Sequence, residues 1–97
     1  MIKHIVLIHW KEGTTEEQIA AVSTALAKLP PLIPEIKSYN YGADLKLYPG
    51  NADYAVIAEF ESEEDFQVYS VHADHIEMMK EVTMPIMQSY VTSQFIE

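Results

Sequence analysis

One histidine and one tyrosine are the residues of this 97-residue chain best suited to acid–base chemistry. The imidazole of His75, neutral near pH 7, can remove a proton from a carbon beside a carbonyl group or deliver one to a leaving group. The hydroxyl of Tyr69 could hold the carbonyl oxygen and stabilise the developing enolate. A helix break separates the two residues, so helical spacing does not bring them together. The alternative is a structural His75, whose ring bonds a backbone group at the bend.

A second histidine, His4, alternates with Val6 and Ile8 along an apolar segment, so the three side chains share one face of a strand. If that face lines a pocket, His4 could orient His75 or the substrate. The alternative is a histidine whose hydrogen bonds are satisfied within the sheet. His9 lies on the opposite face, beside the helices or at a strand end, and we assign it no role.

Metal binding by side chains is not expected. His72 and His75 are three residues apart and could chelate a metal on a helix, but Asp74 would point elsewhere. The chain has no cysteine, which excludes disulfides, thiolate catalysis and cysteine-bound zinc.

Two further groups of residues have more than one interpretation. Four methionines fall close together near the C-terminus, and methionine either lines adaptable apolar pockets or, as we favour here, packs in a core or dimer contact. Tyr39 and Tyr41 alternate outward on the second strand and could line a pocket mouth or a dimer edge. The methionines are Met78, Met79, Met84 and Met87.

The elements that must position these residues follow from apolar spacing and turn signals. Apolar runs predict strands over 2–10, 36–42, 54–60 and 90–96. A capping box of Thr14 and Glu17 predicts the start of a first helix, and Pro30-Pro31 predicts its end. Ser62 followed by three acidic residues predicts a second helix. Residues 71–75 break that helix, and a further helix is expected from Asp74 to about Met84.

The order β-α-β-β-α-β predicts a ferredoxin-like α+β fold, in which a four-stranded antiparallel sheet carries its helices on one face. The length fits a single domain over residues 1–97. The strands are apolar on both sides, whereas the helices can cover only one. A second copy of the sheet is the simplest cover, which predicts a homodimer with a two-sheet, dimeric α+β barrel.

The charge balance limits the classes of molecule that the protein can bind. The formal net charge is −9, with 15 acidic and 6 basic residues, and no basic stripe is present. Such a surface repels nucleic acid and anionic lipid, so we expect neither partner. The sequence has no apolar run of membrane-spanning length and no signal-peptide pattern, so a cytoplasmic location is expected.

Three stretches together resemble the stress-responsive α/β-barrel (Dabb) family. They are the opening motif at 3–7, the entry to the second helix at 60–64 and the histidine motif at 69–75. The resemblance spans essentially the whole chain and implies a small dimeric barrel. The family's histidine motif usually has proline after its first histidine, whereas this chain has Ala73.

The resemblance also suggests site residues. A plant polyketide cyclase of the family closes a linear thioester by aldol condensation, and its histidine, tyrosine and first-strand histidine match His75, Tyr69 and His4. Some relatives bind magnesium through backbone carbonyls, which match Pro30, Ile33 and Ile36 and leave no side-chain signature. The side chains of Val22, Ser23 and Leu26 are smaller or differently shaped than those at the matching positions of the cyclase, so the plant substrate is not expected. The predicted pocket consists of Val6, Ile8, Val22, Leu26 and Met79.

These observations favour a small cofactor-free acid–base enzyme acting on a carbonyl compound, by polyketide-cyclase-like aldol cyclisation or by an isomerase or lyase step. No organic cofactor is required, and magnesium is a further expectation from the resemblance. Two alternatives remain open at this point. One is a non-catalytic, stress-responsive dimeric barrel protein, and the other is a monooxygenase-like or ligand-carrier protein on a similar barrel.

Overall fold

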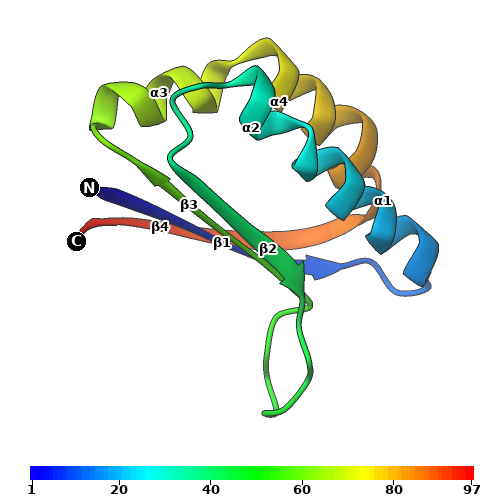
Figure 1. The fold of residues 1–97 in the computed structure, drawn as a ribbon. Coiled ribbons are helices and arrows are strands. Elements are labelled where there is room, and N and C mark those ends of the chain that lie inside the picture. Colours follow the sequence, from blue (N-terminus) through cyan, green and yellow to red (C-terminus); the bar gives the residue numbers. More distant parts are fainter.

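A four-stranded antiparallel sheet with helices on one face forms the protein (Figure 1). The computed structural model describes residues 1–97. The strands are β1 (Ile2–Trp10), β2 (Ser38–Ala43), β3 (Tyr54–Phe60) and β4 (Met87–Ile96), in the spatial order β2-β3-β1-β4. This order is that of a ferredoxin-like fold, which confirms the predicted fold class.

The helices connect these strands across one face of the sheet. The first crossover contains α1 (Glu16–Ala27) and α2 (Leu29–Leu32). The second contains α3 (Glu63–Val71) and α4 (Ala73–Met78), followed by a π-helical turn (Met79–Thr83) and a 3₁₀ turn (Met84–Ile86). The predicted break in the second helical stretch is confirmed at His72, which ends α3 and caps α4 by accepting a hydrogen bond from the Asp74 amide at its Nδ1.

Several predicted boundaries differ from the structure. The second strand begins at Ser38 rather than at 36, and the fourth begins at Met87 rather than at 90. The prediction that Pro30-Pro31 ends the first helix is wrong, because α1 already ends at Ala27 and the two prolines lie within α2. Proline is tolerated there because the first turn of a helix has no use for its amide donors.

The capping box of the first helix lies one residue later than predicted. The Thr15 hydroxyl accepts from the Gln18 amide at 3.2 Å, and the Gln18 side chain accepts from the Thr15 amide at 2.9 Å. The Thr14 hydroxyl instead donates to the Lys11 carbonyl at 2.7 Å. The glutamine at the third helical position closes this box as well as a glutamate does, and the sequence contained both alternatives.

This difference predicts unequal effects of two neighbouring threonines on stability. Thr15→Ala removes the acceptor that satisfies a helix amide and should lower the free energy of unfolding by about 1 kcal/mol. Chemical denaturation measures it, with Thr14→Ala as the control, because Thr14 bonds only to a turn carbonyl outside the helix. If Thr14→Ala lowers the free energy of unfolding as much as Thr15→Ala or more, the predicted capping box of Thr14 and Glu17 is the correct one.

The core lies between the sheet and the helices. The largest fully buried side chains come from both layers and are Tyr54, Phe60, Leu29, Ile33 and Val22. His4, Ile8 and Trp10 of β1 are buried on this same side. His9 is on the opposite face of β1, near its end, and not beside the helices; its Nδ1 lies 3.9 Å from Asp53 Oδ2.

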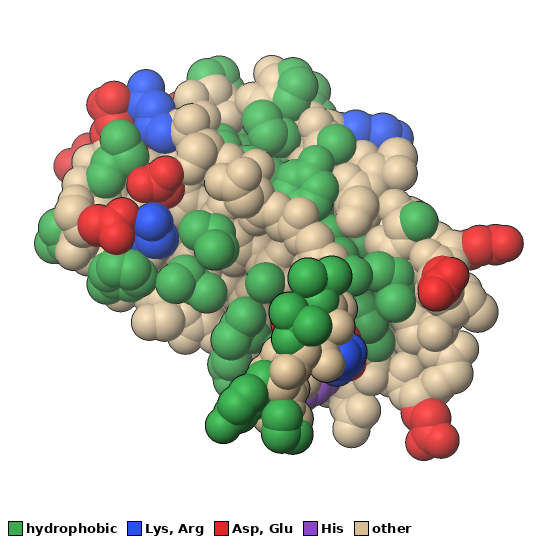
Figure 2. Space-filling view, turned by 60° about the horizontal axis from the view of Figure 1, so that its bottom comes forward, with side chains coloured by type: hydrophobic (Ala, Val, Ile, Leu, Met, Phe, Trp, Pro, Cys, Tyr) green, Lys and Arg blue, Asp and Glu red, His purple; other side chains and the backbone are tan.

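The other face of the sheet has no helix over it and carries several exposed hydrophobic side chains among polar ones (Figure 2). Leu7, Ile57, Val91 and Phe95 are exposed large hydrophobic residues on this face, and Leu7 stands opposite Val91 in the register of β1 and β4. The expectation of strands that are apolar on both sides holds best for β1 and β3, whereas the open-face positions of β2 are Ser38, Asn40 and Gly42. No helix of the fold combines the length and the apolar character needed to cross a membrane.

Candidate active site

A small cavity lies between the helical face of the sheet and the helices. Its volume is about 60 Å³, and eleven of its thirteen lining residues are hydrophobic. Typical ligand pockets are several times larger, so this cavity suits a ligand of few heavy atoms unless its flexible walls move. Every residue of the predicted pocket lines it: Val6, Ile8, Val22, Leu26 and Met79.

The structure brings His75 and Tyr69 together at this cavity. Both line it, and their ring centroids are 4.2 Å apart with an interplanar angle of 31°. The helix break at His72 makes this contact possible, because α4 starts in a new direction after α3 ends. The sequence placed the two residues near each other in the chain, but only the packing of the two helices makes their rings touch.

Hydrogen bonding defines which nitrogen of His75 is free to act as a base. Its Nδ1 lies 3.3 Å from the backbone carbonyl oxygen of Ser70. A carbonyl can only accept, so Nδ1 carries the proton and the lone pair resides on Nε2. Burial lowers the pKa of His75 below its ordinary value, and nearby His72 adds to this, while the bond to Ser70 opposes it. The imidazole is therefore neutral at pH 7, the form that a general base requires.

A second tyrosine, Tyr39, for which the sequence left a pocket mouth and a dimer edge open, completes the polar part of the cavity. The hydroxyls of Tyr39 and Tyr69 are 2.7 Å apart, and Tyr39 also lines the cavity. Burial raises the pKa of both phenols, so both stay protonated at neutral pH. One hydroxyl of such a pair donates to the other, and the second keeps its own proton for a ligand oxygen.

The sequence suggested that Tyr39 and Tyr41 point outward, but in the structure they do not. They stand opposite Ala58 and Val56 of β3, whose side chains are buried under the helices. A strand pattern alone cannot distinguish the two faces when both are apolar, which is why the alternatives of pocket mouth and dimer edge stayed open.

His4 lies behind this pair rather than in the cavity wall. Its ring centroid is 4.9 Å from that of Phe66 and 6.1 Å from that of Tyr69. Its Nδ1 accepts a hydrogen bond from the Gln94 side chain at 2.9 Å, which leaves the proton on Nε2. His4 can therefore help to position Tyr69 but does not contact the cavity itself. Gln94, ninety residues away in the chain, was not identified from the sequence.

The burial of His4 predicts a loss of stability in acid. Desolvation, and secondarily the charge of His75, lower the pKa of His4 to about 4 from its ordinary 6.5. Between these values the unfolded chain binds a proton that the folded chain does not, so stability falls as the pH decreases through this window. A shift of this size corresponds to about 3 kcal/mol.

The measurement is the free energy of unfolding at pH 7.0 and at pH 4.5, compared between the wild type and His4→Gln. The variant should lose about 2 to 3 kcal/mol less than the wild type over this interval, since glutamine does not titrate there. Other acidic and basic groups contribute equally to both proteins and cancel in the comparison. Parallel pH profiles would show that His4 titrates normally in the folded protein.

Side chains offer no metal centre: no group of three or more histidine, aspartate or glutamate side chains is arranged to hold a metal ion. The magnesium expectation rests on carbonyl oxygens of Pro30, Ile33 and Ile36, a donor type that suits magnesium. The Ile33 carbonyl already accepts from the Ile36 amide at 3.1 Å, with a second lone pair left over. A cation held there would stabilise the turn between α2 and β2, and it remains a prediction.

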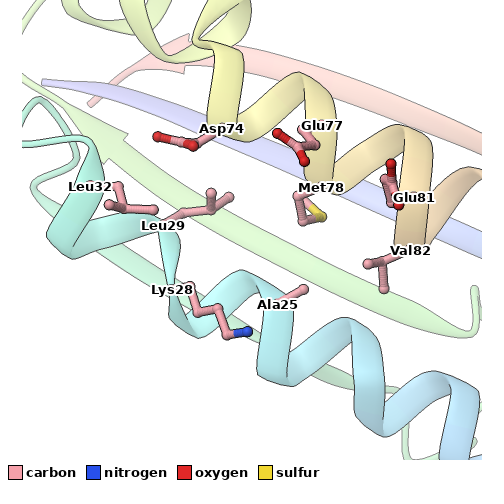
Figure 3. A pocket seen from close by; sticks show the side chains of 9 residues that line it. All are labelled: Ala25, Lys28, Leu29, Leu32, Asp74, Glu77, Met78, Glu81 and Val82. Carbon is pink, nitrogen blue, oxygen red and sulfur yellow. The ribbon is translucent and has the colours of Figure 1, made fainter.

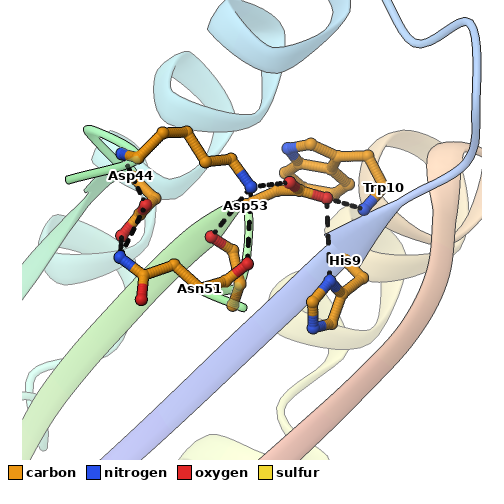
Figure 4. Close-up of polar contacts among 7 residues, drawn as sticks. His9, Trp10, Asp44, Asn51 and Asp53 are labelled. Atoms are coloured by element: carbon orange, nitrogen blue, oxygen red, sulfur yellow. Dashed lines mark hydrogen bonds and ion pairs between the residues drawn. The ribbon is translucent and has the colours of Figure 1, made fainter. Parts of the chain in front are cut away.

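A second polar cluster has a structural role. Asp53 accepts hydrogen bonds from the Trp10 amide and from the Lys46 ammonium group, and these two bonds lower the pKa of its carboxyl group (Figure 4). Asp44 accepts from Asn51 and from the Lys46 amide, which holds Lys46 at a positive φ of 56°. These contacts fix the loop between β2 and β3 to the end of β1.

The sheet order and the one-sided helical layer define a ferredoxin-like α+β protein. The chain matches the family described as Stress responsive A/B Barrel Domain over residues 2–96. The protein therefore belongs to the Dabb family, and the resemblance seen in the sequence is confirmed.

Comparison with known proteins agrees with this assignment. The chain is 32% identical to the stress-response A/B barrel domain-containing protein HS1 of Arabidopsis thaliana, over 78% of this chain and 72% of that protein. It is 30% identical to olivetolic acid cyclase of Cannabis sativa, over 77% of this chain and 76% of that protein.

Among solved structures, a protein from Thermobifida fusca superimposes with a TM-score of 0.91. It is 42% identical, the match covers 99% of this chain and 90% of that one, and the protein is described as dimeric, ferredoxin-like and of unknown function.

Proposed function

We propose that the protein is a homodimeric, cofactor-free acid–base enzyme that acts on a small carbonyl compound. The observation that carries this proposal is the contact between His75 and Tyr69 at one apolar cavity. The lone pair of His75 Nε2 supplies a base, and the tyrosine pair supplies an O–H donor, within a lining that is mostly hydrophobic. Electrostatic stabilisation of developing charge is strongest in such surroundings.

The proposed reaction begins with proton abstraction. Nε2 of His75 takes a proton from the carbon beside the carbonyl group, and the electrons of that C–H bond form the C=C bond of an enolate. Its oxygen is stabilised by the O–H of Tyr69, whose own oxygen accepts from Tyr39. The enolate carbon then attacks a second carbonyl in an aldol step, or it takes a proton at another position in an isomerisation. In either case the imidazolium formed at His75 returns its proton to the product.

The similarity to olivetolic acid cyclase supports this reaction class, since the identity extends over most of both chains. The cavity of this chain is small, which favours a substrate of few carbon atoms over a long polyketide. Aldol cyclisation, isomerisation and a lyase step that starts at the carbon beside a carbonyl share the same first proton transfer, so one assay can address all three.

The homodimer is the second part of the proposal. The open sheet face carries Leu7, Ile57, Val91 and Phe95 in one exposed apolar surface, which is costly to leave in water. The 42% identical Thermobifida fusca protein is described as dimeric, and a second copy would cover this surface sheet to sheet.

Hydrogen exchange at carbon tests the enzyme without knowledge of the natural substrate. The protein is incubated in D₂O with a panel of small aldehydes and ketones, and NMR follows the replacement of C–H by C–D beside the carbonyl. Enzyme-dependent exchange in at least one compound supports the proposal. Compounds that bind without exchange would support the ligand-carrier alternative, and an absence of both binding and exchange would favour the non-catalytic dimer.

A further inference from the structure

A second hollow lies on the outer side of the helical layer, directly behind the cavity. It runs between α1 and α2 on one side and α4 with the π-helical turn on the other (Figure 3). Its volume is about 300 Å³. Ala25, Leu29, Met78 and Val82 contribute its apolar lining, so it is a groove that a small organic molecule can enter.

Met78 is the wall that this groove shares with the cavity, since its side chain lines both. The Met78 sulfur accepts a hydrogen bond from the Thr83 hydroxyl at 3.3 Å, and Thr83 also lines the cavity. Methionine has three rotatable side-chain bonds and adapts its shape easily. No other side chain lines both hollows. The π-helical turn that follows, a rare irregularity often found at functional sites, lies at the same place.

The charges around the groove have one predominant sign. Asp74, Glu77 and Glu81 line the α4 side, whereas Lys28 is the one basic residue opposite them (Figure 3). The cavity itself contains no lysine or arginine, and its histidine is neutral at pH 7. An anionic ligand would therefore meet repulsion on the way in and no counter-charge inside.

We propose that the groove between α1–α2 and α4 is the entrance to the cavity, with Met78 as its gate, and that the site takes uncharged carbonyl compounds. This inference rests on the proposed function and specifies its substrate class. The same charges disfavour carboxylates, phosphates and acyl thioesters of phosphorylated carriers. Three observations support this proposal: Met78 lines both hollows, the groove is mostly acidic, and the cavity is mostly apolar.

The test uses two probes of equal size and different charge. Butane-2,3-dione is uncharged, whereas pyruvate replaces one methyl group by a carboxylate oxygen and is an anion at pH 7. NMR titration follows the ring signals of His75, with His9 as an internal reference on the open face of the sheet. Butanedione should shift the His75 signals in the wild type, and pyruvate should bind at least about threefold more weakly.

Charge reversal at the groove should change this selectivity. Glu77→Lys combined with Glu81→Lys changes the net charge by four, from −9 to −5, at the proposed entrance. Four charge units at roughly 10 Å, screened by salt, correspond to a change of about threefold in the affinity for an anion. Pyruvate should therefore bind about threefold more tightly to this variant, whereas the affinity for butanedione should stay within twofold.

The matched control is Glu16→Lys combined with Glu17→Lys, which makes the same change in net charge at the start of α1, away from the groove. It should leave pyruvate binding within about 1.5-fold. Equal effects of the two double variants, no effect of either, or a wild type that does not bind butanedione at His75 would overturn the inference. If butanedione binds as expected but shows no His75-dependent hydrogen exchange, the proposed enzyme fails while the entrance and its charge selectivity stand.

Discussion

His75→Ala is expected to reduce enzyme-dependent C–H to C–D exchange by about 10²- to 10⁴-fold, because it removes the proposed general base. The imidazole also packs against the Tyr69 ring and bonds to the Ser70 carbonyl, so circular dichroism must first show that the variant is folded. The measurement is the exchange rate of the most responsive compound in D₂O, at equal concentrations of folded protein. Tyr69→Phe should reduce the rate by about 10²-fold or more, as the loss of one oxyanion donor does elsewhere.

The matched control for this prediction is His9→Ala. His9 is also a histidine on the surface of the sheet, but it lies on the face opposite the cavity. This variant should exchange at the wild-type rate. The pH dependence gives a second check: because the pKa of His75 is lowered, the exchange rate should rise with pH through a midpoint below 6.5 and then level off. Wild-type exchange in His75→Ala would refute the mechanism.

Ile57→Lys is expected to break the homodimer. Ile57 lies on the open face of the sheet, opposite Ile5 in the register of β1 and β3, where a second sheet would cover it. A lysine at this position would place an unpaired charge in an apolar interface, at a cost of several kcal/mol. Each 1.4 kcal/mol is a factor of ten in the dissociation constant, so the dimer should weaken by at least about 100-fold.

Sedimentation velocity and light scattering at micromolar concentration measure this effect. The control is Leu32→Lys, which introduces the same charge at an exposed leucine of α2, away from the open sheet face. Leu32→Lys should remain a dimer. A wild-type protein that is a well-folded monomer at micromolar concentration would contradict the proposed dimer, as would an Ile57→Lys variant of unchanged mass. Circular dichroism distinguishes a folded monomer from an unfolded chain.

These two experiments probe opposite sides of the same sheet. The cavity of His75 lies under the helices of one subunit, whereas Ile57 lies on the face away from them. The residues that line the cavity come from a single chain. A folded Ile57→Lys monomer should therefore still bind butanedione at His75. The comparison would separate the role of the dimer in stability from any role in catalysis.

The amino-acid sequence by itself determined the elements and the need for a partner surface. The order of apolar runs, the serine cap at Ser62 and the break near His72 specified the fold, because these signals act between residues close in the chain. Strands that are apolar on both sides indicated that one helical layer cannot cover the sheet. The capping box was placed one residue early because Glu17 and Gln18 satisfy the same local rule equally well.

Only the tertiary structure decided how the site is composed. The sequence named His75, Tyr69 and the pocket residues, partly through the family resemblance, but not the pairs that hold the site together. Tyr39 meets Tyr69 across thirty residues, and Gln94 meets His4 across ninety. Such contacts depend on strand register and on how the helices pack, which no local pattern contains. For the same reason the position of Met78 between the groove and the cavity could not be read from its place in a cluster of methionines.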